Sequence, residues 1–272
     1  MLPIMYDAIF LSPHYDDVAL SCGGTVHKLS QAGKKVLVLT VFSSPSDLPL
    51  SNFAKILHKE MGAVEGLTAI RQAEDKKAMD ILGCKSHYLP FKDCIYRGLR
   101  IHQDTDTQWF YTCFEELLGD IHLNDLSLIE EIANYLSTYW VGSNQPEIYA
   151  PLGVGNHVDH QLVHCVANLL KQRGSRVKFY ADYPYCDPDF SWNRDKINPV
   201  PLSQALAQSA KRVSRYHQEQ ISENNLRARI RGVAAYGSQT PFIFSNWGDM
   251  PQIVANYCNS LSPHGPVEQF WF

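Results

Sequence analysis

The sequence predicts a three-layer α/β protein with a mostly parallel, Rossmann-like sheet. Two observations support this class: strand runs and helical stretches alternate from residue 8 to residue 182, and the first strand runs are continuously apolar. Continuously apolar strands are typical of parallel sheets, because helices cover both faces of such a sheet. No internal repeat or low-complexity tract interrupts the pattern.

The opening of the chain predicts a β-α-β unit. Residues 8–11 form a short apolar run, residues 35–42 form a longer β-branched run, and residues 18–31 between them suit a helix that follows Asp16-Asp17. A right-handed crossover is expected for this unit. The first connection therefore lies at the carboxyl end of the first strand.

The same alternation continues along the chain. Residues 67–82 place apolar side chains on one helical face, and Gly83 follows where a C-cap glycine belongs. The other predicted elements are strands at 86–90, 147–151 and 176–182 and helices at 126–140, 158–173, 202–216 and 222–235.

At 272 residues, the chain is expected to form one domain over 1–272, with a core of about 1–185 and a C-terminal subregion of about 186–272. Residues 92–125 do not fit the alternation, and they are either a lid or substrate loop or a partly helical surface excursion. The apolar tail at 270–272 either packs on the core or joins a subunit interface, which leaves a homo-oligomer open.

Composition excludes several classes of protein. Net charge is −4 without a dense Lys/Arg stripe, so nucleic acid is not an expected partner. No apolar run approaches the roughly 18 residues of a membrane helix, and no basic segment precedes an apolar stretch at the start. Seven scattered cysteines without a Cys-x-x-Cys pair fit reduced thiols. We therefore expect a cytoplasmic protein.

Two polar motifs follow strands one and four of the predicted sheet. Because ligand sites form outside the carboxyl ends of parallel strands, the two motifs are expected to converge. Zinc catalysis uses three ligands from His and carboxylate, an open position for water and a base beside it. His14, Asp17 and His160 can supply the ligands, Asp16 points to one side of the metal, and His157 can approach a substrate oxygen.

Each motif also has a structural interpretation. A lone Asp before a helix is usually an N-cap, and a lone His is usually a satisfied polar residue. A different class of function is a nucleotide- or methyl-donor-binding module with Cys22-Gly-Gly24 as its glycine turn, although the Gly-x-Gly-x-x-Gly spacing is missing. A third is a metal-free sugar-binding relative that has lost activity. Elemental analysis separates these three hypotheses, since only the zinc-dependent catalyst requires about one metal ion per chain.

Three motifs carry a family resemblance. Pro13-His-Tyr-Asp-Asp17, Ser21-Cys-Gly-Gly-Thr25 and His157-Val-Asp-His160 resemble, in order and spacing, motifs of the LmbE-like or PIG-L family of zinc N-deacetylases. The resemblance extends to Arg71-Gln-Ala-Glu74 and to Ala235-Tyr-Gly-Ser-Gln239. It implies an LmbE-like deacetylase fold and removal of an acetyl group from a small-molecule N-acetyl amino sugar or glycoconjugate, such as an N-acetylglucosamine conjugate.

The resemblance also implies roles for single residues. The implied roles are zinc binding by His14, Asp17 and His160, general base for Asp16, oxyanion stabilisation or amine protonation for His157, orientation of a histidine for Asp159, and contacts to sugar hydroxyls for Arg71 and Asp93. Two histidines and one carboxylate also suit iron, so the metal is zinc, iron or another divalent ion.

The sequence departs from the family pattern at five positions. These are Tyr15, Val18, Ser21, Val158 and Tyr236, where the family has Pro, Glu, Gly, Pro and His. None of them is a proposed ligand or base, so we expect catalysis to survive and substrate identity to differ.

Overall fold

The computed structural model of the chain describes residues 5–63, 66–101, 107–139, 145–190, 200–209 and 215–272. In this part of the chain, a seven-stranded sheet has the order β3-β2-β1-β6-β7-β9-β8. The strands are β1 Ala8–Ser12, β2 Val36–Thr40, β3 Lys85–Tyr88, β6 Glu147–Pro151, β7 Arg176–Tyr180, β8 Tyr216–Gln220 and β9 Val267–Trp271. The first five are parallel to one another, and β9 runs antiparallel to both of its neighbours. The predicted α/β class with a mostly parallel sheet is therefore confirmed.

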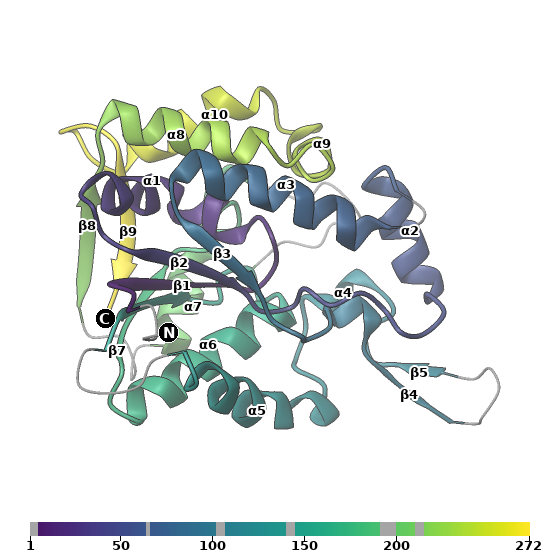
Figure 1. Cartoon of the computed structure of the whole chain (residues 1–272). Helices are drawn as coiled ribbons and strands as arrows, with labels where there is room; N and C mark the ends of the chain where they lie inside the picture. The colour runs from purple at the N-terminus through teal and green to yellow at the C-terminus, as the bar shows by residue number, and fades with distance from the viewer. Residues whose placement is uncertain (1–4, 64–65, 102–106, 140–144, 191–199, 210–214) are drawn as a thin grey trace.

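Helices cover both faces of the sheet (Figure 1). On one face lie α1 Asp17–Gln31, α3 Leu67–Leu82, α8 Glu223–Ala234 and α10 Met250–Ser260, and on the other lie α5 Ser127–Leu136 and α6 Val158–Gln172. Shorter helices outside the insertion at 92–125 are α2 Asn52–Glu60, α7 Leu202–Ser209 and α9 Thr240–Phe244.

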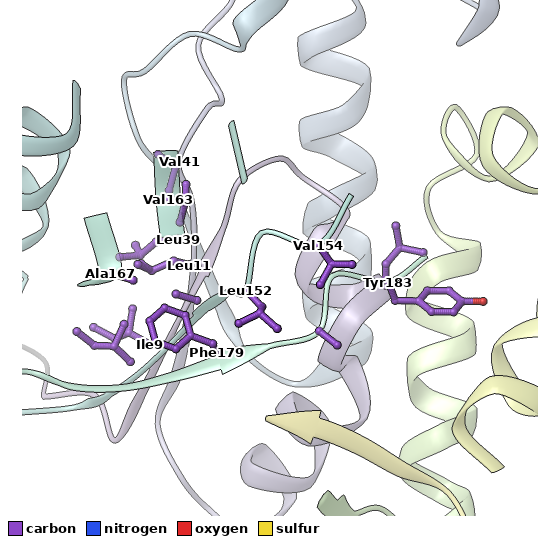
Figure 2. Close-up of a cluster of buried hydrophobic side chains, with 14 of the residues drawn as sticks. Ile9, Leu11, Leu39, Val41, Leu152, Val154, Val163, Ala167, Phe179 and Tyr183 are labelled. Carbon is purple, nitrogen blue, oxygen red and sulfur yellow. The ribbon is translucent and has the colours of Figure 1, made fainter. Parts of the chain in front are cut away.

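Alternating side chains of the central strands fill two apolar layers. Ile9 and Leu11 face α6, where they join Val163 and Phe179 in the cluster that Figure 2 shows. Phe10 points to the opposite face and packs with the apolar side chains of α1, α3 and α8. Both faces of β1 are buried, which explains its uninterrupted apolar sequence.

Helix α1 contains a break at Cys22, whose φ and ψ are −148° and 27°. The backbone N–H groups of Gly24 and Thr25, next to the break, donate to the buried carboxylate of Glu268 at 2.9 and 2.7 Å. Arg229 of α8, fully buried, pairs with the same carboxylate at 2.9 Å and also donates to the carbonyl of Leu20. The break is therefore stabilised by charged partners from the C-terminal subregion.

The glycine pair in α1 serves close packing. A Cβ atom at Gly23 would lie 3.3 Å from the side chain of Arg229, and one at Gly24 would lie 2.6 Å from Ile221. The pair is buried against protein, which favours a role in packing the first helix closely over a glycine turn for a nucleotide.

The C-terminal subregion corrects one prediction. Residues 202–216 were expected to form one helix, but α7 ends at Ser209 and Tyr216 begins strand β8, with residues 210–214 outside the described part. Strand β8 is an edge strand with mostly exposed side chains, and its pairing with β9 fixes its conformation. Of the two alternatives for the apolar tail, the structure supports packing on the core. Phe270 and Trp271 lie in β9 and are buried against it.

The insertion at 92–125 is mostly irregular. It contains the short helices η1 Cys94–Tyr96, α4 Phe114–Leu117 and η2 Leu123–Asp125 and a hairpin of β4 Gly98–Arg100 and β5 Thr107–Trp109. The hairpin projects from the body of the molecule in Figure 1. Within the described residues, no helix is long and apolar enough to cross a membrane.

Candidate active site

Two neighbouring strands place the polar motifs together. The turn from β1 to α1 carries His14 and Asp17, and the start of α6, after β6, carries His157 and His160. Strands β1 and β6 are paired in the sheet, so both motifs leave the same sheet edge. The turn after β6 uses a left-handed backbone at Gly155, where a Cβ atom would lie 2.4 Å from the ring of Tyr185. This close approach brings Tyr185 to the site.

Three buried side chains form a compact donor set. Asp17 Oδ2 lies 3.2 Å from His14 Nδ1 and 3.4 Å from His160 Nε2. One ligand atom from each of the three residues lies within 4.8 Å of the others. Two imidazole nitrogens and one carboxylate oxygen at this spacing match the protein ligands of a catalytic zinc site that keeps a position for water.

The outer nitrogen of each imidazole faces a buried carboxylate. His14 Nε2 lies 3.0 Å from Asp159 Oδ2, and His160 Nδ1 lies 2.7 Å from Asp182 Oδ1. Carboxylates in this position accept the outer N–H, fix the tautomer and leave the inner nitrogen as a metal ligand. The residues present therefore fit a divalent cation at His14, Asp17 and His160.

The electrostatics of the donor set also favour a cation. Burial opposes protonation of His14, but Asp93, Asp159 and Asp17 outweigh burial and raise the pKa of His14 well above its usual value. Burial likewise opposes protonation of His160, while Asp17 and Asp182 raise its pKa to about 9. Positive charge between these carboxylates is stabilised, and a metal ion would replace the protons there.

Asp16 lies beside the donor set but turns toward Arg71 of α3. Arg71 Nη2 is 3.1 Å from Asp16 Oδ1. Burial raises the pKa of Asp16, Arg71 opposes this, and the neighbouring charge of Asp17 raises it further. A carboxylate held in a fixed place with a raised pKa is suited to accept a proton.

His157 lies next to the imidazoles of His14 and His160. Its ring centroid is 4.8 Å from that of His14 and 5.2 Å from that of His160. Burial and the charges of these two histidines lower the pKa of His157 well below its usual value. Its Nδ1 accepts the backbone N–H of Asp159 at 3.2 Å, so the proton of the neutral ring is on Nε2. His157 can therefore donate one hydrogen bond from Nε2.

A pocket opens above these residues, and all of the predicted site residues except Asp159 line it. Its cavity volume is about 90 Å³ when open solvent is left out. Arg71 and Asp93 line it together, with Arg71 Nη1 3.9 Å from Asp93 Oδ2. Asp159, fully buried, lies behind His14, as expected of a residue that orients a histidine.

Two residues of the site were missed at the sequence level. Asp182 closes the predicted strand at 176–182, and its place at a strand end was a usable signal. Arg97 carried no such signal, since it lies in the irregular insertion and reaches Asp159 only in the folded chain, with Nη2 2.6 Å from Oδ1. Asp159 could also join His14 and His157 in a donor set, but Arg97 already engages its carboxylate.

Comparison with known proteins gives a consistent result. The family described as PIG-L: GlcNAc-PI de-N-acetylase matches residues 9–170, which is more than half of the chain and includes every motif residue from His14 to His160. A 2'-N-acetylparomamine deacetylase of Niallia circulans is 28% identical over 220 residues, which cover 76% of this chain and 77% of that protein.

Solved structures share the fold. A deacetylase from the biosynthesis pathway of teicoplanin, in a complex described as deacetylase-bog, has a TM-score of 0.79 at 23% identity and covers 97% of this chain and 96% of its own. The zinc-inhibited form of a teicoplanin deacetylase has a TM-score of 0.73 at 20% identity with the same coverage. At these identities, the likeness establishes the architecture.

Proposed function

This chain belongs to the PIG-L family, and from that premise we propose that it is a metal-dependent hydrolase that removes the acetyl group from the amine of an N-acetylated amino sugar. One observation carries the proposal: His14, Asp17 and His160 form a donor set that Asp159 and Asp182 support from behind, with the carboxylate of Asp16 beside it. The curated relative's name, 2'-N-acetylparomamine deacetylase, supports an acetylated amine as the substrate.

His14, Asp17 and His160 would hold the ion, which supplies Lewis-acid chemistry by polarising the acyl oxygen and lowering the pKa of water. The donor set of two histidines and one carboxylate suits zinc and also iron. Asp182 and Asp159 keep the two imidazoles in the tautomer that such an ion requires.

Asp16 is the proposed general base. Its carboxylate is held by Arg71 and its raised pKa allows it to take the proton of the attacking water. His157 donates from Nε2 to the oxyanion that forms at the acyl carbon. Because the lowered pKa of His157 keeps its ring neutral, protonated Asp16 is the better placed acid to return a proton to the leaving amine.

Arg71 and Asp93 are the proposed contacts for sugar hydroxyls. Both line the pocket next to Asp16, and together they offer hydrogen-bond donors and acceptors on that side of it. N-acetylglucosamine conjugates are the candidate substrates, since the family is described by a GlcNAc-containing substrate.

The test is acetate release from a panel of N-acetylglucosamine conjugates by protein that has been chelated and then reloaded with zinc or iron. We expect release with metal and none without, together with about one metal ion per chain by elemental analysis. A purified protein that binds no divalent metal and releases no acetate from any conjugate would refute the proposal and favour a sugar-binding protein without activity.

A further inference from the structure

The pocket has two chemically different parts. One part, which we call the floor, holds all of the ionisable side chains with a role proposed above that line the pocket: His14, Asp16, Asp17, Arg71, Asp93, His157 and His160. Of the twelve other lining residues, Tyr185 and Gln239 are the ones with polar side chains. The rest form an apolar wall.

Three elements outside the parallel sheet build most of this wall. Each supplies two side chains at adjacent or helical spacing: Leu57 and Met61 from α2 and its end, Phe114 and Leu117 from α4, and Phe242 and Ile243 from α9. All six belong to, or pack against, an apolar cluster of the interior, and five of them share the same cluster: Leu57, Met61, Phe114, Leu117 and Phe242. The wall is thus the open side of a packed cluster.

The wall is suited to an uncharged partner. An ammonium group placed against it would lose hydration, and no carboxylate among the described lining residues outside the floor could pair with it. An apolar group would gain by leaving water, at roughly 0.8 kcal/mol per buried methylene. Met61, Phe114 and Phe242 are half-buried and present surface for such a contact.

We propose that the substrate carries an apolar group on the glycosidic side of its acetylated amino sugar and that the wall of Met61, Phe114 and Phe242 binds it. This inference rests on the proposed function. An acetyl group has two carbons, and its carbonyl must lie against the floor, where His157 and Asp16 act. The wall is therefore left for the part of the substrate beyond the sugar.

The experiment measures equilibrium binding, so that it does not depend on turnover. Calorimetry with metal-loaded Asp16→Asn protein compares the methyl, butyl and hexyl glycosides of N-acetylglucosamine. We expect the dissociation constant to fall at least about tenfold from methyl to hexyl. A second series keeps the methyl glycoside and lengthens the N-acyl group from acetyl to butanoyl and hexanoyl, and we expect no gain there. A gain in the acyl series alone, or in neither series, overturns the proposal.

A matched pair of variants locates the contact. In the Asp16→Asn background, Met61→Gln, which keeps side-chain length, should reduce the hexyl-to-methyl gain about threefold or more. Leu123→Gln, at a position that is 80% exposed in η2, should leave that gain as it is. A gain that survives Met61→Gln and Phe242→Gln in full contradicts the assignment of the wall.

Acetate release by the wild-type protein keeps the two proposals separate. Release from the methyl glycoside without any dependence of binding on chain length would refute the apolar subsite and leave the deacetylase function standing. Binding that depends on chain length, without acetate release from any glycoside, would refute the deacetylase function and leave the apolar subsite standing.

Discussion

Arg97 of the insertion and Asp159 of α6 form a buried ion pair, with Arg97 Nη2 2.6 Å from Asp159 Oδ1. The other oxygen of Asp159 lies 3.0 Å from His14 Nε2 and accepts the backbone N–H of Cys94 at 3.0 Å. Burial alone would raise the pKa of Asp159, but Arg97 and His14 outweigh it and hold the pKa below its usual value. The insertion therefore supports the site from behind, whatever else its exposed hairpin does.

Arg97→Met removes the charge that compensates Asp159. Because Asp159 and Asp125 would both lose a buried ion-pair partner, we expect the free energy of unfolding to fall by about 3–5 kcal/mol. We also expect metal affinity to weaken about 10–100-fold, since Asp159 no longer fixes His14. Urea unfolding and competition with a chromophoric chelator measure the two effects. Arg97→Lys should recover part of both.

The control is Arg100→Met, which removes an exposed arginine three residues along the same insertion. It should change unfolding free energy by no more than about 0.5 kcal/mol and leave metal affinity unchanged. Wild-type metal affinity in Arg97→Met would show that Asp159 keeps its place without the insertion.

Asp16→Asn and His160→Ala should separate catalysis from metal binding. Asp16 is outside the donor set, so Asp16→Asn should keep about one metal per chain while acetate release falls by at least about 100-fold. His160→Ala removes a ligand and should lose both. Elemental analysis beside an acetate assay gives the answer, and a fully active Asp16→Asn protein would remove the base assignment.

The sequence was informative where local pattern and tertiary environment agree. Residues 67–82 were predicted as a helix and form α3, which ends at Gly83 with φ of +74°. The strand at 147–151 was predicted with the bounds that β6 has. Because β1 is buried throughout and β6 is buried from Ile148 onward, their apolar runs indicate their central position in the sheet, and the motifs at their ends follow from it.

The sequence pattern did not predict elements whose conformation depends on pairing with distant parts of the chain. Strand β8, Tyr216–Gln220, is polar and was not predicted: Tyr216 was placed at the end of a helix and residues 217–220 in no element, yet the strand pairs with β9 some fifty residues later. Its exposed side chains carry no period that distinguishes an edge strand from a helix. Arg97 is a similar case, since a buried arginine in an irregular segment has meaning only with Asp159 beside it. The apolar wall, drawn from α2, α4 and α9, likewise exists only after folding.

Asp182→Asn should weaken the metal site through His160. Asp182 Oδ1 lies 2.7 Å from His160 Nδ1, while its Oδ2 accepts the backbone N–H groups of Gly153 and Val154 at 2.9 and 3.0 Å. An amide can still accept from the backbone but holds the imidazole less firmly, so metal affinity should fall about 10–100-fold with little change in fold. The chelator competition assay measures this. Asp187→Asn, in the following turn and away from His160, is the control, and equal affinities in the two variants would contradict the role given to Asp182.

Asp75 of α3 lies in a buried network with two tyrosines. Asp75 Oδ1 is 2.7 Å from the hydroxyl of Tyr236, which is also 2.7 Å from the carbonyl of Tyr15, and Asp75 Oδ2 is 3.0 Å from the hydroxyl of Tyr88. Tyr236 has one proton for two acceptors. A protonated Asp75 completes the network, because it donates to Tyr236 while Tyr236 donates to Tyr15. Tyr15 and Tyr236, both departures from the family pattern, are thus coupled next to Asp16.

This network makes stability depend on pH. Burial raises the pKa of Asp75 from 3.8 to about 7, although Tyr236 and Tyr88 lower it in part. Because the folded chain then binds the proton more tightly than the unfolded chain, its contribution is complete below pH 3.8 and is lost as pH rises through about 7. The loss in unfolding free energy should be about 4 kcal/mol at most. Urea unfolding from pH 4 to pH 8 measures this loss.

Asp75→Asn, whose amide donates to Tyr236 at every pH, should flatten this pH dependence of the unfolding free energy. Asp80→Asn, on the exposed face of α3, should preserve it. An unchanged slope in Asp75→Asn would mean that Asp75 is ionised throughout and that Tyr236 donates to it instead of to Tyr15.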